Sequence, residues 1–410
     1  MASADDLLPR PGDTGEIPAV VRHGHRRPPK RRRWIKRSAI GLSAVIVLAL
    51  LLGGAGWFYI NYRLGQIPTV KHVKHLIPVK PGAPMNILLI GSDSRVGIPA
   101  DEVPNYGGTS GPNAVTGQRS DVIIILRVVP ATHSLEMLSI PRDTWANIPG
   151  TGTSNKINSA FNYGPSELIL AIEDDFHIPI NHFVYTTFPG FTNAVDDLGG
   201  VYMDFPDPVH DTVTGLNIKT TGCQLLNGVN SLALVRSRDL SYYVDGGWNY
   251  DGLGDLSRIR RQQEFFHAVI DRAQTEYNPI RLNAFIGDVV HDITVDSSFT
   301  VPDLRSLAIE YHSTPSSALH TDVLPTQGAV INGSDVLLPA WRPDEVLIHD
   351  FLAVGATPPT GSTTTTTTTT TQPSTTTTTT QPDVSGTTTP IIYDNTKDYP
   401  EPWNPVPCNG

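Results

Sequence analysis

Arginines gather in two short spans in the second half of the chain. The first, LVRSRDL, contains Arg236 and Arg238. The second, DLSRIRRQQ, contains Arg258, Arg261 and Gln262, which share one face if the span is helical. Guanidinium forks suit bidentate recognition of phosphate. Any one of these arginines could simply pair with an acidic residue, but their clustering in a body that is otherwise acidic predicts a polyphosphate ligand.

Further charged residues stand at the ends of predicted strands. GSDSR places Asp93 just after one strand, RSD places Arg119 and Asp121 just before the next, and SIPRD places Arg142 after a third. The two carboxylates could hold one Mg²⁺ ion, with water and phosphate oxygens completing its shell. With arginines facing it, such an ion would stabilise charge that develops on a transferring phosphoryl group.

The elements that must position these residues follow from apolar patterns. Short and nearly all-apolar runs bounded by turn residues predict strands buried on both faces, and apolar residues at helical spacing predict helices. The strands are expected at Asn86–Gly91, Val122–Val129 and Leu135–Ile140, and the helices at Ser166–Phe176, Phe188–Leu198 and Asp255–Glu276. This mixture predicts the α/β class, as a three-layer α/β/α sandwich.

The direction of the second strand decides whether the charged clusters can meet. Ligands of such sheets bind beyond the carboxyl ends of strands, where Asp93 and Arg142 are expected. Arg119 and Asp121 precede their strand, so they reach the same edge only if that strand is antiparallel to its neighbours. We therefore expect a mixed central sheet.

Several other chemistries lack their motifs. The sequence has no Walker pattern, no nucleotide-binding glycine fingerprint, no histidine-rich metal motif and no G-x-S-x-G elbow of serine hydrolases. The net charge of the chain is −10. Residues 1–37 carry ten basic and four acidic residues, whereas the rest carries 20 basic and 36 acidic ones. An acidic body excludes a protein that wraps nucleic acid, and we expect no nucleic-acid partner.

The basic N-terminal segment precedes an uncharged apolar run. The run, residues 38–62, is long enough to cross a bilayer and predicts one transmembrane helix. Nine basic residues between Arg22 and Arg37 place residues 1–37 in the cytoplasm and the body outside the cell membrane. A cleaved secretory signal and a twin-arginine export signal at Arg31–Lys36 are the alternatives.

The remaining boundaries follow from composition. Residues 63–84 are expected to be a juxtamembrane linker, and residues 85–354 one extracellular domain near the upper size for a single core. Residues 355–390 are almost all Thr, Pro, Ser and Gln, a composition that cannot form a core and predicts a disordered spacer. Residues 391–410 are expected to be a frayed end, with docking onto the body as the alternative.

At these motifs the sequence resembles the LytR-CpsA-Psr family, whose domain is also called the cell-envelope-related transcriptional attenuator. Seven blocks carry the resemblance between Met85 and Asp271, in the family's order: NILLIGSDSR, RSDVIIIL, LEMLSIPRDTW, KINSAFNYG, FPGFTNAVDDLGGV, GCQLLNGVNSLALVRSRDL and DLSRIRRQQEF. The resemblance implies a membrane-anchored enzyme that transfers a glycopolymer from a polyprenyl-pyrophosphate carrier to a sugar hydroxyl of the cell wall.

The resemblance also implies roles for individual residues. The family's metal-binding carboxylates fall on Asp93 and Asp121, with Mg²⁺ as the implied cofactor. Its pyrophosphate-clamping and catalytic arginines fall on Arg119, Arg142, Arg236 and Arg238, and the clamp extends to Arg258 and Gln262. Family members bury the polyprenyl chain in an apolar channel, whose lining the sequence does not identify. Many relatives carry a second small C-terminal domain where this chain has the threonine-rich spacer, which leaves substrate presentation open.

The chain has two cysteines, Cys223 within the domain and Cys408 beyond the spacer. An oxidising exterior permits a bridge between them. Two free thiols or an intermolecular link are the alternatives.

Three other functions fit parts of the same pattern. A transcriptional attenuator would require the body to lie in the cytoplasm. A non-catalytic carrier-binding or glycan-binding protein would use the same arginines and carboxylates without turnover. A pyrophosphatase would differ from the transferase only in that water attacks in place of a sugar hydroxyl.

Overall fold

The computed structural model describes residues 54–59, 61–92, 120–275, 293–356 and 405–408. It divides into two compact units, residues 1–59 and 60–410. Residues 54–59 of the first unit are helical. Within the described ranges, none of the helices combines the length and the apolar character needed to cross a bilayer. Most of the span predicted at 38–62 lies outside these ranges.

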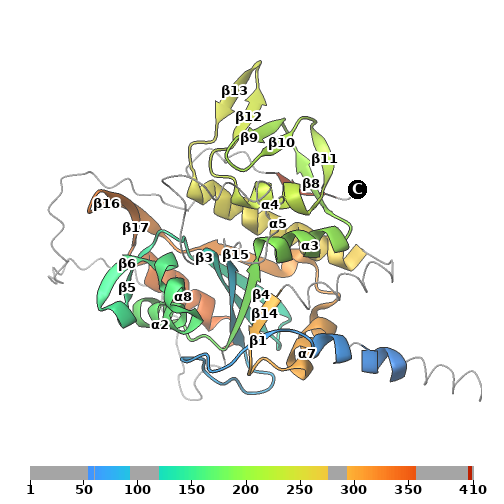
Figure 1. Cartoon of the computed structure of the whole chain (residues 1–410), viewed down its shortest axis with the longest axis vertical. Coiled ribbons are helices and arrows are strands. Elements are labelled where there is room, and N and C mark those ends of the chain that lie inside the picture. Colours follow the sequence, from blue (N-terminus) through green and yellow to red (C-terminus); the bar gives the residue numbers. More distant parts are fainter. Residues whose placement is uncertain (1–53, 60, 93–119, 276–292, 357–404, 409–410) are drawn as a thin grey trace, which may run out of the picture. The chain divides into compact units, whose positions relative to one another are not determined.

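A seven-stranded sheet forms the centre of the second unit (Figure 1). Its order is β1-β14-β7-β2-β3-β4-β15, with bounds Thr69–Val70, Ile293–Asp296, His182–Thr187, Met85–Ser92, Ser120–Val129, Ser134–Ser139 and Leu319–Val323. Strand β3 is antiparallel to both β2 and β4, whereas β7 runs parallel to β2. The mixed sheet that the sequence predicts is therefore confirmed, including the direction of β3.

One face of this sheet packs against α2 (Pro165–Phe176) and α8 (Pro343–Ala353). Alternate residues of β2 and β3, such as Leu88 and Ile125, enter a large buried core with Leu168 and Ile172 of α2. Proline is favoured in the first turn of a helix, where α2 has Pro165, and this helix ends at a residue in the left-handed conformation, His177. This face is the densely packed side of the sheet.

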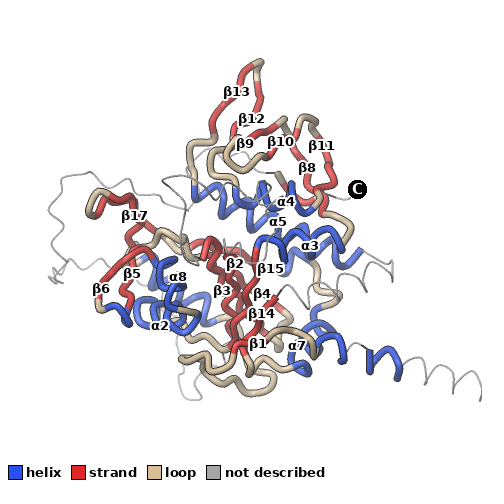
Figure 2. The backbone as a smooth tube through the Cα atoms, viewed as in Figure 1, coloured by secondary structure: helices blue, strands red, loops and turns tan. Residues whose placement is uncertain are grey.

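The opposite face packs against α5 (Asp255–Thr275) and α7 (Val301–Tyr311). Phe266 and Ile270 of α5 contact the sheet residues Ile124 and Met137. Helix α7 begins with a capping box in which Thr300 and Asp303 exchange hydrogen bonds. Helices thus cover both faces of the sheet, and the predicted three-layer arrangement describes this unit (Figure 2).

A second, smaller core joins α5 to a group of short strands. Phe265 and Ala268 of α5 pack with residues of this group, including Met203 and Leu234. Two sheets, ordered β10-β9-β12-β13 and β11-β8-β18, surround the core together with two helices. Bounds are Phe188–Asp197 (α3), Gly228–Arg236 (α4), Val201–Phe205 (β8), Val209–Asp211 (β9), Leu216–Ile218 (β10), Gly222–Leu226 (β11), Ser241–Val244 (β12), Gly247–Tyr250 (β13) and Val406–Pro407 (β18).

Two hairpins and three short 3₁₀ helices complete the described elements. Strands β5 and β6 pair with each other, as do β16 and β17. Their bounds are Trp145–Ile148 (β5), Thr153–Lys156 (β6), Thr326–Ile331 (β16) and Ser334–Pro339 (β17), and the 3₁₀ helices are Pro149–Thr151 (η2), Ile157–Tyr163 (η3) and Ser316–Ala318 (η4).

The folded unit begins earlier than the sequence indicated. Residues 63–84, expected to be a linker, supply strand β1 at the edge of the central sheet. Leu64 and Ile67 pack in the core beside α7. A strand of two residues is too short to show an alternating pattern of its own and forms by pairing with β14, so the sequence alone did not indicate β1.

The C-terminal segment also departs from expectation. Residues 391–410 were expected to be a frayed end, yet Val406–Pro407 form β18 and pair with β8. Cys408 is joined to Cys223 of β11 by a disulfide that spans 185 residues of sequence. Of the alternatives for the two cysteines, the structure shows the intramolecular bridge.

Candidate active site

The strand ends beside which the sequence predicted site residues lie together at one edge of the central sheet. Strands β2 and β7 end there at Ser92 and Thr187, and the antiparallel β3 begins there at Ser120. Ser92 is paired with both Ser120 and Thr187 in the sheet register. Asp121 therefore lies at this edge. Asp93 and Arg119, the sequence neighbours of Ser92 and Ser120, lie outside the described residues.

A cavity of about 790 Å³ opens at this edge, between the central sheet and helices α3, α4 and α5. All six described residues of the predicted site line it: Asp121, Arg142, Arg236, Arg238, Arg258 and Gln262. Most of the other lining residues are apolar, from the sheet (Leu89, Val122, Ile124, Val184 and Ile293) and from the three helices and the residue that follows α3 (Phe188, Phe191, Ala194, Val195, Leu198, Leu232, Val235, Phe265, Phe266 and Val269). The cavity thus combines a cationic cluster with an extensive apolar lining.

Arg142 follows β4 and pairs with two carboxylates. Its guanidinium forms an ion pair with Asp121 and lies 3.8 Å from Asp143 Oδ2. Burial alone would lower the pKa of Arg142, but the negative charges of Asp121, Asp143 and Asp255 outweigh burial and raise it. Arg142 therefore stays charged at the sheet edge while its carboxylate partners hold it in place.

Helix α5 contributes Arg258 and Gln262 to the cavity. Arg258 is almost fully buried, and its Nη2 atom lies 2.6 Å from Asp255 Oδ1. Burial lowers the pKa of Arg258 to about 10, which still leaves the guanidinium charged at neutral pH. Gln262 donates through Nε2 to the carbonyl of Val235 at 2.9 Å, which ties α5 to α4.

Arg261 shows why helical spacing alone could not select the site residues. It is fully buried on α5, forms a 2.7 Å ion pair with Asp251 and donates to the carbonyl of Ser237 at 2.8 Å. Unlike Arg258 and Gln262, it does not line the cavity. Its role is structural, since it joins the smaller core to the start of α5.

Helix α4 and the residues after it place Arg236 and Arg238. The first residue of α4, Gly228, lies so close to the backbone of Thr192 in α3 that a side chain there would clash. At the other end of the helix, the Arg236 guanidinium lies 4.3 Å from the ring centroid of Phe188, a cation–π contact. Arg238 lies within ion-pair distance of Asp255 and Asp143, at 3.4 and 3.9 Å. The close contact between α3 and α4 thus brings both arginines to the sheet edge.

The cationic cluster retains unused donor capacity. The Nε atoms of Arg142 and Arg258 are buried and have no hydrogen-bond acceptor among the described residues. Buried donors normally have a partner, because losing hydration without replacing it is costly. The positive charges of these guanidinium groups, which line the cavity, would favour an anion such as phosphate there.

The donor set suits a hard divalent cation only in part. Asp121 supplies one carboxylate at the sheet edge, and Asp93 follows the adjacent strand end in the sequence. No group of three or more His, Cys, Asp or Glu side chains with metal-site geometry occurs among the described residues. Because Mg²⁺ is commonly held by one or two carboxylates together with substrate phosphates, Asp121 is compatible with an ion that binds with its substrate.

The sequence did not identify the apolar lining or the supporting carboxylates. Phe188, Phe191 and Val195 of α3 recur at helical spacing, but a stripe that lines a cavity has the same spacing as one that fills a core. Asp143 and Asp255 were present in the marked motifs SIPRD and DLSR. Their role as ion-pair partners of the arginines became visible only with the three-dimensional arrangement.

Comparisons with known proteins agree with this architecture. A protein of Corynebacterium glutamicum named probable cell wall biosynthesis protein LcpB is 32% identical over 309 residues, which are 73% of this chain and 69% of the relative. A polyisoprenyl-teichoic acid–peptidoglycan teichoic acid transferase, TagU of Oceanobacillus iheyensis, is 27% identical over 74% of this chain and 89% of its own length.

Solved structures show the same fold. A LytR-Csp2A-Psr enzyme from Actinomyces oris matches with a TM-score of 0.55 and 26% identity, over 70% of this chain and 95% of that one. B. subtilis TagV matches with a TM-score of 0.52 and 23% identity, over 67% of this chain and 98% of that one. The family model described as LytR_cpsA_psr matches residues 64–343, which include every site residue named above. This chain therefore belongs to the LytR_cpsA_psr family.

Proposed function

We propose that this protein is a membrane-anchored, Mg²⁺-dependent phosphotransferase. In this proposal it transfers a glycopolymer phosphate from a polyprenyl-pyrophosphate carrier to a sugar hydroxyl of the cell wall. The observation that carries the proposal is the composition of the cavity, in which four arginines meet a lining of apolar side chains. A relative is named a polyisoprenyl-teichoic acid–peptidoglycan teichoic acid transferase, which supports the same class of reaction.

The two kinds of lining match the two parts of such a donor. A pyrophosphate carries several negative charges, for which Arg142, Arg236, Arg238 and Arg258 supply guanidinium donors. A polyprenyl chain gains free energy by leaving water, at about 25 cal/mol for each Å² of apolar surface buried. A water-soluble nucleotide or sugar phosphate would leave the apolar lining without a partner. The cavity therefore favours a lipid-linked donor.

The proposed reaction replaces the phosphoanhydride bond of the donor with a phosphate ester bond to the wall sugar. The oxygen of a wall sugar hydroxyl attacks the phosphorus that carries the glycopolymer, and a new P–O bond forms. The bond from that phosphorus to the bridging oxygen breaks, so that polyprenyl phosphate leaves, and the hydroxyl proton passes to solvent. The products are a wall-linked phosphodiester and a lipid monophosphate.

The arginines act on the charge that develops in this exchange. Arg142 and Arg258 line the cavity and carry positive charge, so their guanidinium groups would bind pyrophosphate oxygens. Their ion pairs with Asp121 and Asp255 fix the guanidinium groups before the substrate binds, which lowers the cost of reorganisation. Asp121 and Asp93 would hold Mg²⁺, which supplies charge neutralisation at the transferring phosphoryl group.

The topology in this proposal follows from the sequence. The basic residues 22–37 and the apolar run 38–62 would anchor the chain with its N-terminus in the cytoplasm. The folded unit would then lie on the outer side, where lipid-linked glycopolymers meet the wall. A reporter fused after residue 356, active only outside the cytoplasm, tests this arrangement. Lack of reporter activity from a fusion that is produced at full length would overturn it and would revive the transcriptional alternative.

The activity itself is tested with the full-length chain in detergent micelles. The donor is a polyprenyl-pyrophosphate-linked disaccharide with a radiolabelled glycan, and the acceptor is peptidoglycan stripped of other polymers. We expect Arg142→Ala to lower the transfer rate by about 10²–10³-fold, because it removes a charged donor from the reacting phosphate. Arg342→Ala, at an exposed arginine outside the cavity, is the matched control and should leave the rate unchanged.

The products separate transfer from its alternatives. Radiolabel linked to peptidoglycan supports the transferase, whereas soluble glycan phosphate alone supports a pyrophosphatase. Donor binding without either product supports a carrier-binding protein. Transfer by Arg142→Ala at the rate of the unaltered protein would refute the assignment of this cavity as the active site.

A further inference from the structure

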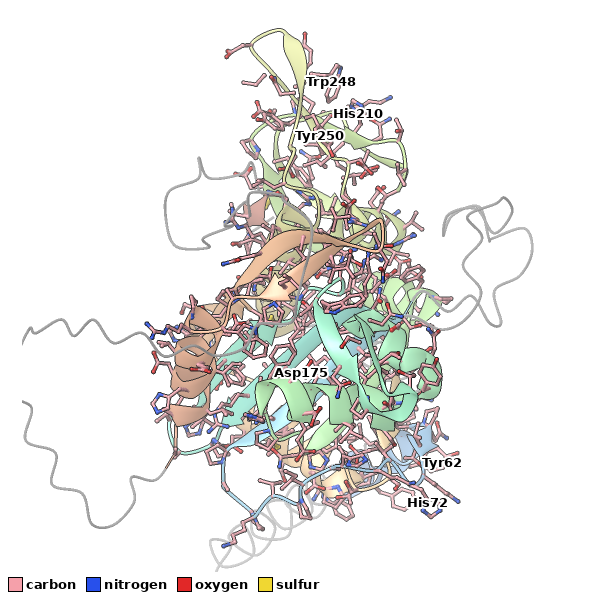
Figure 3. All side chains as sticks on the ribbon, turned by 90° about the vertical axis from the view of Figure 1, so that its left-hand side faces the viewer. Tyr62, His72, Asp175, His210, Trp248 and Tyr250 are labelled. Atoms are coloured by element: carbon pink, nitrogen blue, oxygen red, sulfur yellow. A yellow bond between two sulfur atoms is a disulfide. The ribbon has the colours of Figure 1, made fainter. Side chains whose placement is uncertain are left out.

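Four aromatic side chains share one face of the small sheet that contains β9, β12 and β13. Tyr243 pairs with Trp248 across β12 and β13, and Ser241 pairs with both Tyr250 and His210. Directly paired residues and residues two apart point to the same side of a sheet. His210, Tyr243, Trp248 and Tyr250 therefore lie on one side, which we call the aromatic face. Figure 3 shows His210, Trp248 and Tyr250 together on this projecting part of the molecule.

The aromatic face is exposed although its rings contact one another. The ring centroid of Trp248 lies 4.0 Å from that of His210 and 5.3 Å from that of Tyr243, both in edge-to-face arrangements. Tyr243, Trp248 and Tyr250 are nevertheless 41, 52 and 58% exposed. Burying aromatic side chains stabilises a fold, so aromatics with a purely structural role are normally buried. Several large aromatics exposed together on one surface more often mark a binding site.

The backbone beneath these rings is a well-defined hairpin. Asp245 and Gly246 form its two-residue connection, with φ angles of 53 and 81°. Positive φ at both central positions is the requirement of the tight turn that best matches the twist of a β-hairpin. The rings are thus presented by a short, regular scaffold, which lowers the entropic cost of binding to them.

The aromatic face continues into the mouth of the cavity. Tyr250 lines the cavity, and its hydroxyl donates to Asp239 Oδ1 at 3.2 Å. Asp239 lines the cavity as well and follows directly after Arg238. A ligand that lies along the aromatic face therefore ends next to the cationic cluster, on the side of α4 and β13.

We propose that the aromatic face binds the acceptor glycan strand and directs its hydroxyl into the cavity. This inference rests on the proposed transferase function and names the place of its second substrate. Sugar rings present polarised C–H groups to the electron-rich faces of aromatic rings, while their hydroxyl groups stay hydrated. A sugar therefore has both apolar and polar surfaces. Partly exposed aromatic side chains beside polar groups suit a sugar better than they suit a wholly apolar ligand.

The charge of the hairpin favours a glycan as the ligand, rather than an anionic membrane or polymer. Residues 241–250, with the sequence SYYVDGGWNY, contain no Lys or Arg and one acidic residue, Asp245. A site for anionic lipid or for a phosphate-rich polymer would need basic residues close to the rings. The cations lie instead at the cavity, where the donor pyrophosphate is expected. The two substrates would thus bind on chemically different surfaces that meet at Tyr250.

The test compares two exposed tryptophans in the full-length chain. Trp248→Ala removes the central ring of the aromatic face, and Trp248→Phe keeps an aromatic ring there. Trp341→Ala is the matched control, because Trp341 is 61% exposed and does not line the cavity. Each variant is first compared with the unaltered protein by thermal unfolding. Binding is then measured by cosedimentation with polymer-free peptidoglycan, and transfer by the Michaelis constants for acceptor and for donor.

We expect Trp248→Ala to weaken peptidoglycan binding and to raise the KM for acceptor by about tenfold, without changing the KM for donor. Trp248→Phe should recover most of the binding, and Trp341→Ala should match the unaltered protein. Unchanged peptidoglycan binding by Trp248→Ala would overturn the proposal. Stronger binding of the unaltered protein to phosphatidylglycerol vesicles than to peptidoglycan, lost in Trp248→Ala, would also overturn it.

The outcomes distinguish this inference from the function on which it rests. If the unaltered protein transfers glycan and Trp248→Ala transfers equally well with the same acceptor KM, the aromatic face is not the acceptor site and the function stands. If the protein binds peptidoglycan through Trp248 but transfers nothing, the docking surface stands and the transferase function fails.

Discussion

The two faces of the central sheet are built from the same strands, but one is packed throughout and the other borders a cavity. On the side of α2 and α8, Leu88 and Ile125 are fully buried in a continuous core. On the other side, Leu89 and Val122 line a cavity of about 790 Å³ beneath α3, α4 and α5. Because side chains alternate along a strand, neighbouring residues of β2 contribute to one face or the other. The fully packed face stabilises the fold, so the protein can tolerate a cavity for a ligand on the other face.

The largest effect that tests this contrast should come from two adjacent leucines of β2. Leu88→Ala should lower the free energy of unfolding by about 3–5 kcal/mol, because the fully buried side chain leaves a cavity in a packed core. Leu89→Ala, the matched change on the other face, should cost less than about 2 kcal/mol, since Leu89 already borders open space. Urea unfolding of the full-length chain measures both. Equal losses would contradict the contrast between the faces.

A smaller effect should come from an unpaired carboxyl beside the dense face. Asp344 lies in the first turn of α8, is 2% exposed, and neither carboxyl oxygen has a hydrogen-bond partner in the described structure. Burial raises the pKa of Asp344 to about 7. Between about pH 4 and pH 7 the unfolded chain therefore ionises this carboxyl while the folded chain keeps it protonated, so stability falls as pH rises.

Asp344→Asn removes this titration while keeping the shape of the side chain. The variant should be more stable than the unaltered protein at pH 8, by a free energy on the order of 4 kcal/mol. The difference should shrink toward zero near pH 4, where both forms are neutral in the folded state. Thermal unfolding at pH 4.5 and pH 8 measures the change. A difference that is independent of pH would show that Asp344 does not titrate in this way.

The smallest effect should come from partly filling the cavity beside the sheet. Ala194 lies on α3 and lines the cavity, so Ala194→Leu adds three carbon atoms to the space beneath it. We expect transfer from a donor with a long polyprenyl chain to fall by about tenfold, and transfer from a short-chain donor to change little. The free energy of unfolding should stay within about 1 kcal/mol of the unaltered value. Equal effects on both donors would place the lipid elsewhere.

Much of this architecture could be predicted from local patterns. The buried strands β2, β3 and β4 and the helices α2, α3 and α5 carry clear apolar signals, and their observed bounds lie close to those predicted. The antiparallel direction of β3 followed from a chemical requirement, that Asp121 reach the same edge as its partners. The six described residues of the predicted site could be selected as candidates because charge clusters are conspicuous in an acidic body, and the structure brings them to one cavity.

Other parts depend on contacts that a pattern does not contain. Arg258 and Arg261 stand three residues apart on α5. Arg258 lines the cavity, whereas Arg261 is buried in an ion pair with Asp251. The difference depends on where the loop after β13 passes, which is a tertiary property. The short strands β1 and β18 likewise form by pairing with β14 and β8, and two residues carry no pattern that would reveal such a strand. The aromatic face required the register of three strands before its rings could be assigned to one side.

The disulfide between Cys223 and Cys408 gives the chain a covalent topology of its own. Every residue from 224 to 407, including the threonine-rich segment and helix α5, lies within one closed ring of covalent bonds. A protease that cut the threonine-rich segment once would open the ring without releasing a fragment, because the terminal piece would stay attached through Cys408. A single cut in the threonine-rich segment therefore does not release the piece that contains Cys408, and reduction of the disulfide is needed as well.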